Sequence, residues 1–141
     1  RFENKFEYEV NIDKDIDINY LKVPPLFIQP FVENAIWHGI MQKKQNGKVR
    51  VDISRKDKNL MITITDDGIG REKAELLKSK TGMGKKSMGM KIATARLDSM
   101  EKLYNISCRA KVIDLKDNDG NPLGTKVIIT LPLITSFKYE K

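Results

Sequence analysis

Two short alternating segments constrain the fold of this 141-residue chain more than any other feature of its sequence. Residues 49–53 and 60–64 carry valine, leucine or isoleucine at every second position, and a polar turn at 57–59 separates them. A period of two predicts half-buried strands, and the short spacing predicts that they pair as a hairpin over residues 48–66. One face of this hairpin is apolar, so a second layer must cover it.

The remaining elements follow from the same two periodicities and from turn residues. Alternation again indicates strands, and apolar residues three and four apart indicate helices. The expected elements are a strand at 6–12, a helix from Pro25 or Leu26 to Gly39, the hairpin, a short charged helix near 72–78, a glycine- and lysine-rich loop at 80–89, a helix at 90–104, and strands at 107–115 and 127–131. Because hairpins outnumber strand–helix–strand units, the sequence predicts an α/β (α+β) two-layer sandwich. Its sheet is mixed and largely antiparallel, with helices on one face.

Composition narrows the kind of protein. Apolar residues at 40% and charged residues at 32% suit a single globular domain, which we place at residues 1–134 with a C-terminal tail at 135–141. No apolar run approaches the roughly 20 residues that a membrane-spanning helix needs. The lone Cys108 cannot form an internal disulfide, and no cysteine–histidine cluster offers a zinc site. A start at Arg1 rather than Met indicates a piece of a longer protein.

The net charge of +7 is concentrated in one part of the chain. Residues 71–111 hold eleven basic and four acidic side chains, which equals the whole surplus. A solvated face explains most such runs. Nucleic acid, an anionic membrane or a phosphate ligand would each explain this one as well.

Polar residues also gather where the first helix and the hairpin end. Asn34 and His38 are four residues apart and would share one helix face. Asp66 closes the second hairpin strand, and Gly68 and Gly70 follow it, so the backbone there could approach a ligand closely. The plainer alternatives are a helix end that turns toward solvent and an ordinary glycine turn.

A third feature is the segment 82–89, which combines three glycines with two lysines just before a helix. Exposed N–H groups and the positive end of a helix dipole favour an anion at such a place. The spacing matches neither G-x-x-x-x-G-K-[ST] nor a G-x-G-x-x-G that follows a strand. A phosphate site is therefore one interpretation of this loop, and no known phosphate motif specifies it.

In this order the three features resemble the N, G1 and G2 boxes of the GHKL ATPase superfamily, which includes histidine-kinase ATP-binding domains, type II topoisomerase subunits, Hsp90 and MutL. Gly124 and Thr125, before the last strand, resemble its G3 box. The run PPLFIQPFVENAIWHG at 24–39 resembles the N box of LytS/YehU-type sensor histidine kinases. The resemblance covers about residues 1–133 and implies the Bergerat ATP-binding fold (HATPase_c).

The resemblance also implies roles for individual residues. Asn34 matches the asparagine that coordinates Mg²⁺ on the nucleotide phosphates, and Asp66 matches the aspartate that accepts a hydrogen bond from the adenine amino group. Residues 82–89 match a lid over the phosphates. The implied catalytic residues are Asn34, Glu33 and His38, and the implied ATP-binding residues are Asn34, Ala35, His38, Asp66, Gly68, Ile69, Gly70, Met83, Gly84, Lys85, Lys86, Ser87, Met88, Gly89, Met90 and Thr125.

The implied activity is that of a protein-histidine kinase in two-component signalling. The γ-phosphoryl group of ATP·Mg²⁺ would pass to a histidine on a separate upstream dimerisation domain, without which this domain is expected to be inactive as a kinase. His38 belongs to the nucleotide-binding box and is not expected to be the acceptor. The implied partners are that domain and, indirectly, a response regulator. The full-length protein is expected to be a homodimer and a membrane-anchored bacterial sensor, of which this is a cytoplasmic domain without its own membrane or nucleic-acid contact.

Two departures from the family pattern bear on activity. Pro30 stands where GHKL hydrolases place a water-activating carboxylate, so efficient ATP hydrolysis is not expected. Trp37 stands where many histidine kinases carry a basic residue. The alternatives are a GHKL-fold ATPase unconnected with histidine phosphorylation and a basic nucleic-acid-binding module. The second rests on +7 alone and is disfavoured by an aromatic content of 7%.

Overall fold

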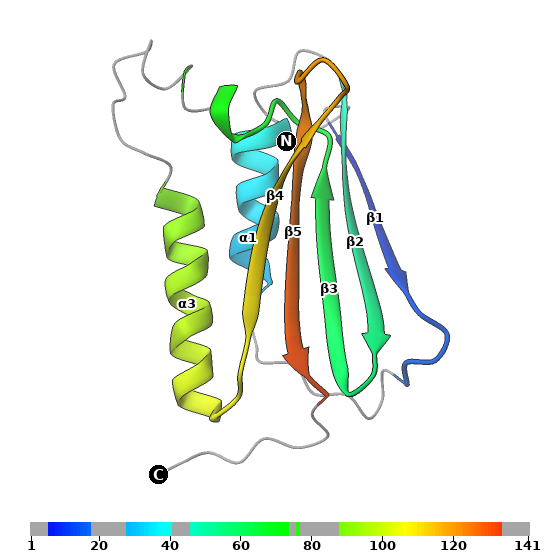
Figure 1. Ribbon diagram of the computed structural model, residues 1–141, viewed down its shortest axis with the longest axis vertical. Coiled ribbons are helices and arrows are strands. Elements are labelled where there is room, and N and C mark those ends of the chain that lie inside the picture. The colour runs from blue at the N-terminus through cyan, green and yellow to red at the C-terminus, as the bar shows by residue number, and fades with distance from the viewer. Residues whose placement is uncertain (1–5, 18–27, 41–45, 74–75, 77–87, 134–141) are drawn as a thin grey trace.

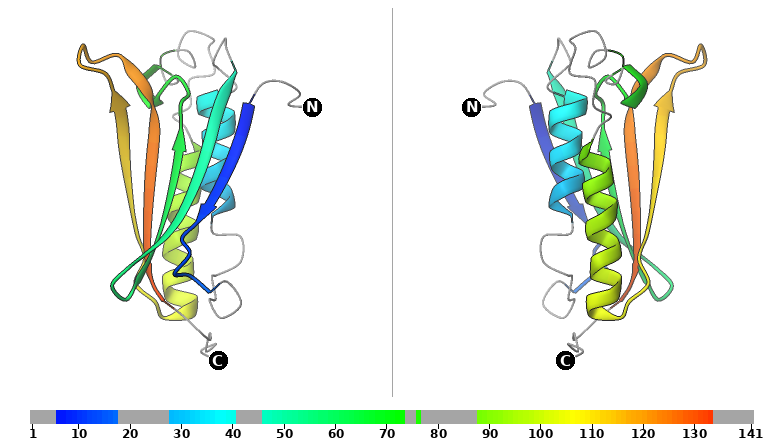
Figure 2. Two further views of the ribbon diagram at one scale, coloured as in Figure 1. Left: turned by 90° about the vertical axis from the view of Figure 1, so that its right-hand side faces the viewer. Right: turned by 90° about the vertical axis from the view of Figure 1, so that its left-hand side faces the viewer.

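A five-stranded sheet and the helices that cover one of its faces form the two layers of the molecule (Figures 1 and 2). The computed structural model describes residues 6–17, 28–40, 46–73, 76 and 88–133. This arrangement confirms the predicted two-layer sandwich. None of the helices within the described ranges has the length and apolar character that crossing a bilayer requires.

The sheet is mixed, as predicted. Its strand order is β1-β2-β3-β5-β4, with β1 parallel to β2 and every other neighbouring pair antiparallel. The predicted hairpin is β2 and β3, joined by a tight turn in which Asp57 has a φ of 56°. The strands are β1 (Phe6–Ile12), β2 (Gly47–Lys56), β3 (Asn59–Asp66), β4 (Arg109–Lys116) and β5 (Pro122–Pro132).

The first helix differs from the prediction at both ends. It begins as α1 (Gln29–Asn34), with Ile28 as its N-cap, and continues as the π-helix η1 (Ala35–Ile40). The predicted start at Pro25 or Leu26 was therefore wrong. Pro30 instead lies in the first turn, where its missing N–H leaves no hydrogen bond unmade. The predicted stop at Gly39 was also wrong, because Gly39 keeps a helical conformation and the winding continues to Ile40.

The second long helix, α3 (Met88–Tyr104), begins two residues earlier than predicted. Gly89 was expected in the loop but lies in the first helical turn, where the N–H groups have no partner within the helix in any case. Before it, residues 71–73 and Leu76 are helical, as the predicted short charged helix requires. Residues 80–87 of the predicted loop lie outside the described residues.

Two strand boundaries were also displaced. β4 begins at Arg109, two residues late, because the Cys108 N–H donates to Glu101 Oε1 on α3 (2.6 Å) and so binds the helix end. β5 begins at Pro122, so Gly124 and Thr125 lie within the strand and not before it. Pairing with β3 on one side and β4 on the other extends the ladder through these residues.

The core lies between the sheet and the two long helical segments. Alternate residues of the central strands β3 and β5 face the helices, and Ile62, Ile64, Ile129 and Leu131 are at most 1% exposed. Phe31 of α1 packs into the same cluster, together with apolar residues of α3. The apolar face on which the prediction rested is therefore the face that the helices bury.

Candidate functional site

A row of polar residues crosses three neighbouring strands at one end of the apolar face. Asp66 of β3 is paired with Thr125 of β5, and Thr125 is paired in turn with Asp114 of β4. Further along β3 and β5 the same face carries only core residues such as Ile64 and Val127. Asp66 and Thr125 are 5% and 7% exposed, so a carboxylate and a hydroxyl are buried at the rim of the core.

The environment of Asp66 makes it a strong acceptor held in one place. The Gly68 N–H donates to Asp66 Oδ1 (3.0 Å), and the backbone of Thr125 also hydrogen-bonds to this carboxylate. Burial raises the pKa of Asp66 from its ordinary value of 3.8 to about 6; the two backbone hydrogen bonds oppose the rise, and the neighbouring charge of Asp67 adds to it. The group is therefore mostly ionised at pH 7, and a carboxylate has more acceptor positions than these two donors use.

The loop after Asp66 is fastened to the neighbouring strand β2. The Lys48 N–H donates to the Asp67 carboxylate (2.7 Å), and the Asp67 N–H donates to the Lys48 carbonyl (3.3 Å). Beyond this tie Gly68 and Gly70 are buried, and Gly70 has a φ of +84°, which favours glycine. The start of the loop, at Asp67, is thus held by contacts on the β2 side.

Gly124 shows how closely β5 approaches this loop. A Cβ at Gly124 would overlap the carbonyl oxygen of Asp66 and crowd the Cα of Asp67, and its φ of +136° is one that side chains rarely adopt. No larger residue is therefore compatible with this contact. The close approach is what brings the Thr125 backbone within hydrogen-bonding reach of the Asp66 carboxylate.

Asn34 stands at the last position of α1, where the α-helix passes into η1. Its Oδ1 atom is buried and has no hydrogen-bond partner among the described residues. Leaving a buried acceptor unpaired costs about 1–3 kcal/mol, and a ligand that bound this atom would remove that cost. Amide and carboxylate oxygens are the ligands that Mg²⁺ prefers, and π-helical turns are frequent at functional sites, so this position fits a divalent cation.

Glu33 does not share this position. Its side chain is exposed, and its Oε1 accepts a hydrogen bond from Gln29 Nε2 (2.7 Å) one helical turn earlier. The neighbouring Trp37 is also exposed, at 52%. Ala35, in contrast, is buried at the start of η1.

Some of the expected site residues lie together in the structure, and others lie outside the described residues. Asp66, Gly68, Ile69, Gly70 and Thr125 lie together where β3 and β5 meet the loop. His38 lies in η1, and its side chain is outside the described part of the chain. The expected lid residues Met83, Gly84, Lys85, Lys86 and Ser87 lie outside the described residues, whereas Met88, Gly89 and Met90 form the first turn of α3.

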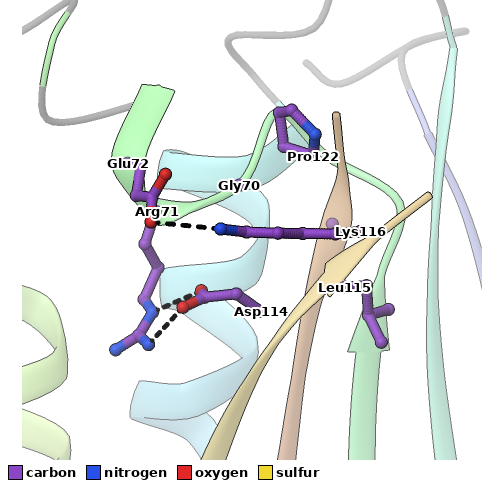
Figure 3. Close-up of a pocket in the computed structure, with 8 residues that line it drawn as sticks. Gly70, Arg71, Glu72, Asp114, Leu115, Lys116 and Pro122 are labelled. Carbon is purple, nitrogen blue, oxygen red and sulfur yellow. Dashed lines mark hydrogen bonds and ion pairs between the residues drawn. The ribbon is translucent and has the colours of Figure 1, made fainter. Parts of the chain in front are cut away.

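Sequence reasoning missed two ion pairs beside this site. Arg71 donates from Nε and Nη2 to the two carboxylate oxygens of Asp114, at 2.8 Å each, and Lys116 lies 3.3 Å from Glu72 (Figure 3). The partners stand 43 and 44 residues apart, so no local spacing could have revealed them.

Comparison with known proteins adds three findings. The family described as histidine kinase-, DNA gyrase B- and HSP90-like ATPase matches residues 26–135. YwpD of Bacillus subtilis (strain 168) is 35% identical over 98 residues, covering 69% of this chain and 34% of that protein. The sensor protein LytS of Enterococcus faecalis (strain ATCC 700802 / V583) is 39% identical over 82 residues, covering 57% of this chain and 14% of that protein.

Solved structures share the fold. A histidine kinase domain from the blue-light activated histidine kinase of Erythrobacter litoralis EL346 superposes with a TM-score of 0.60 at 19% identity, over 93% of this chain and 53% of that one. The histidine kinase ThkA, in a complex with the response regulator protein TrrA, gives a TM-score of 0.58 at 15% identity, over 95% of this chain and 37% of that one. Among the curated relatives, this chain spans 34% of the length of YwpD and 14% of the length of LytS.

Proposed function

Because the chain belongs to the family of histidine kinase-, DNA gyrase B- and HSP90-like ATPases, we propose that it binds ATP at the Asp66 site and acts as the catalytic domain of a sensor histidine kinase. The observation that carries the proposal is the buried Asp66 carboxylate, oriented by the backbone N–H of Gly68 and by the backbone of Thr125. An acceptor of this kind suits one exocyclic amino group of a bound base.

The proposed partner of Asp66 is the adenine amino group. Adenine presents a donor at that position, whereas guanine presents a carbonyl oxygen, which an ionised carboxylate would repel. Gly68 supports the same role, since a residue without a side chain would let a flat ring lie close to the backbone beside Asp66. Asp66 would thus select ATP over GTP, because it attracts the amino group of adenine and repels the carbonyl oxygen of guanine.

We place the phosphate end at Asn34. Its Oδ1, which has no hydrogen-bond partner among the described residues, would hold Mg²⁺, and this ion would neutralise the negative charge of the phosphates when bound. His38 on η1 and the lid lysines Lys85 and Lys86 would contribute further contacts to the phosphates. Contacts from Lys85 and Lys86 would account for part of the positive charge of residues 71–111 by pairing it with a triphosphate.

The reaction we propose is transfer of the γ-phosphoryl group to a histidine on another domain of the same protein. Positioning and charge neutralisation account for most of the catalysis of phosphoryl transfer. Pro30 stands where a water-activating carboxylate would be needed for hydrolysis, so we assign the domain to transfer. The wider assembly we propose is a homodimeric, membrane-anchored sensor that signals to a response regulator.

The proposal is tested by calorimetric titration of the chain with ADP and ATP, with Mg²⁺ and with EDTA. Asp66→Ala should weaken both nucleotides in either condition, whereas Asn34→Ala should remove only the gain in affinity that Mg²⁺ provides. Asp98→Ala and Asn118→Ala are matched controls, because both side chains are exposed and belong to α3 and to the β4–β5 turn. Equal affinity in the wild type and in both site variants would refute the site, and competition by GTP as strong as by ATP would refute the role of Asp66.

A further inference from the structure

We propose that Arg71 and Asp114 form a positioning clamp that holds the loop 66–70 in the geometry that recognises adenine. The inference rests on the proposed function of that loop and adds residues to which that function assigns no part. Neither side chain needs to touch the nucleotide for this role. They act through the backbone that carries Asp66 and Gly68.

The clamp has the geometry of a strong ion pair. Both carboxylate oxygens of Asp114 accept hydrogen bonds from the Arg71 guanidinium, at 2.8 Å each, in a bidentate arrangement (Figure 3). These hydrogen bonds, together with the charges of Arg71 and Lys116, hold the pKa of Asp114 below its ordinary value. The pair is therefore ionised throughout the neutral range.

Strand register places the clamp beside the recognition row. Asp114 pairs with Thr125, and Thr125 pairs with Asp66, so Asp114 lies two strands, about 10 Å, from Asp66 in the same row. The backbone leaves this row after Asp66, and the Arg71 side chain reaches back to the row at Asp114. The ion pair therefore closes a ring made of the loop and three strands.

The opposite end of the loop already has an anchor. Two hydrogen bonds join the Lys48 backbone to Asp67, one through its carboxylate and one through its N–H, and fix this end to β2, on the far side of Asp66 from β4. Between the anchors, Gly70 adopts a φ of +84°, and a Cβ at this position would lie only 2.9 Å from the Pro122 Cβ, too close for any side chain. Two glycines make this stretch of backbone the most permissive part of the site, so an anchor at each end is what restricts it.

The clamp contributes little to the stability of the fold. Arg71 and Asp114 are 44% and 29% exposed, and exposed ion pairs add little to the free energy of unfolding. β4 is held independently by its ladder with β5. Loss of the pair should therefore loosen the loop without unfolding the sheet, which separates a positioning role from a structural one.

The first experiment needs no nucleotide. Hydrogen exchange of the free protein should be faster at the amides of Gly68–Glu72 in Arg71→Ala and in Asp114→Asn than in the wild type, with unchanged exchange in β3 and β5. Arg50→Ala is the matched control, because the Arg50–Asp52 pair has a similar exposure of 50% and 34% but lies within one strand. Unchanged exchange of the loop in both clamp variants would overturn the proposal.

The second experiment is a double-mutant cycle on ADP affinity, measured well below the melting temperature. Each single variant should raise the dissociation constant about three- to fivefold, and Arg71→Ala with Asp114→Asn should cost no more than either alone. ATP should show the same factor, because the clamp acts at the base end. Multiplicative losses, a larger loss for ATP than for ADP, or wild-type affinity in both single variants would each refute the clamp. Failure of the wild type itself to bind ADP would instead refute the proposed function.

Discussion

Replacing Asp66 by asparagine should make the nucleotide-free protein more stable at neutral pH, although it damages the site. The carboxylate is 5% exposed, and its burial raises its pKa from 3.8 to about 6. Between these two values the folded protein holds a proton that the unfolded chain has already released. The free energy of unfolding therefore falls as the pH rises through this window, and it stays lower above pH 6.

The size of the effect follows from the two pKa values. At 1.36 kcal/mol for each unit of pH, the interval from 3.8 to about 6 corresponds to a loss of about 3 kcal/mol. Asparagine keeps an oxygen that can accept from the Gly68 N–H, has nearly the same shape and does not ionise. Asp66→Asn should therefore match the wild type near pH 4 and exceed it by about 2–3 kcal/mol at pH 7.

The assay is urea unfolding of both proteins in the absence of nucleotide, at pH 4 to 8. Plotting the difference in free energy of unfolding against pH cancels the other titrating groups. Asp114→Asn provides a control of opposite sign and smaller size, since Arg71 lowers the pKa of Asp114 and this exposed pair adds only a little to the free energy of unfolding at neutral pH. A flat difference for Asp66→Asn, or one that favours the wild type as the pH rises, would show that Asp66 is not the buried acceptor with a raised pKa described above.

Three further outcomes are expected. Gly124→Ala should abolish cooperative thermal unfolding, followed by circular dichroism, because its Cβ would overlap the Asp66 carbonyl; Gly120→Ala, whose φ of +83° is strained but whose surroundings are open, should cost only about 1–2 kcal/mol. Ile129→Ala should lower the free energy of urea unfolding by about 2–5 kcal/mol, against less than about 0.5 kcal/mol for the exposed Leu123→Ala. ADP affinity measured by titration calorimetry should fall below pH 6, as protonation removes the charge of Asp66, and an affinity independent of pH between 5 and 8 would contradict this.

Element types followed from the sequence more securely than their boundaries. Alternation and helical spacing are properties of consecutive residues, so the β2–β3 hairpin and the helical character of α1 and α3 could be predicted. The ends depend on which backbone groups find partners elsewhere. Gly39 and Gly89 stayed helical, and Cys108 bound the end of α3 instead of joining β4.

The residues of the candidate site also differ in whether the sequence alone could reveal them. Asp66, Gly68 and Gly70 follow one another directly after a strand, so their motif could be read from the sequence, as could the polar end of the first helix at Asn34. That Asn34 Oδ1 is buried and has no hydrogen-bond partner within the described ranges could not be read from the sequence, because it depends on what packs over α1.

By itself, the sequence determined the strands, the helices and the short motifs, because each depends on residues that are neighbours along the chain. Only the tertiary structure decided that Gly124 meets the Asp66 backbone, that burial raises the pKa of Asp66, and that Arg71 pairs with Asp114. The physical reason is common to all three. Close approach, loss of water and ion pairing depend on distances in space, and strand register sets these distances between segments far apart in the sequence.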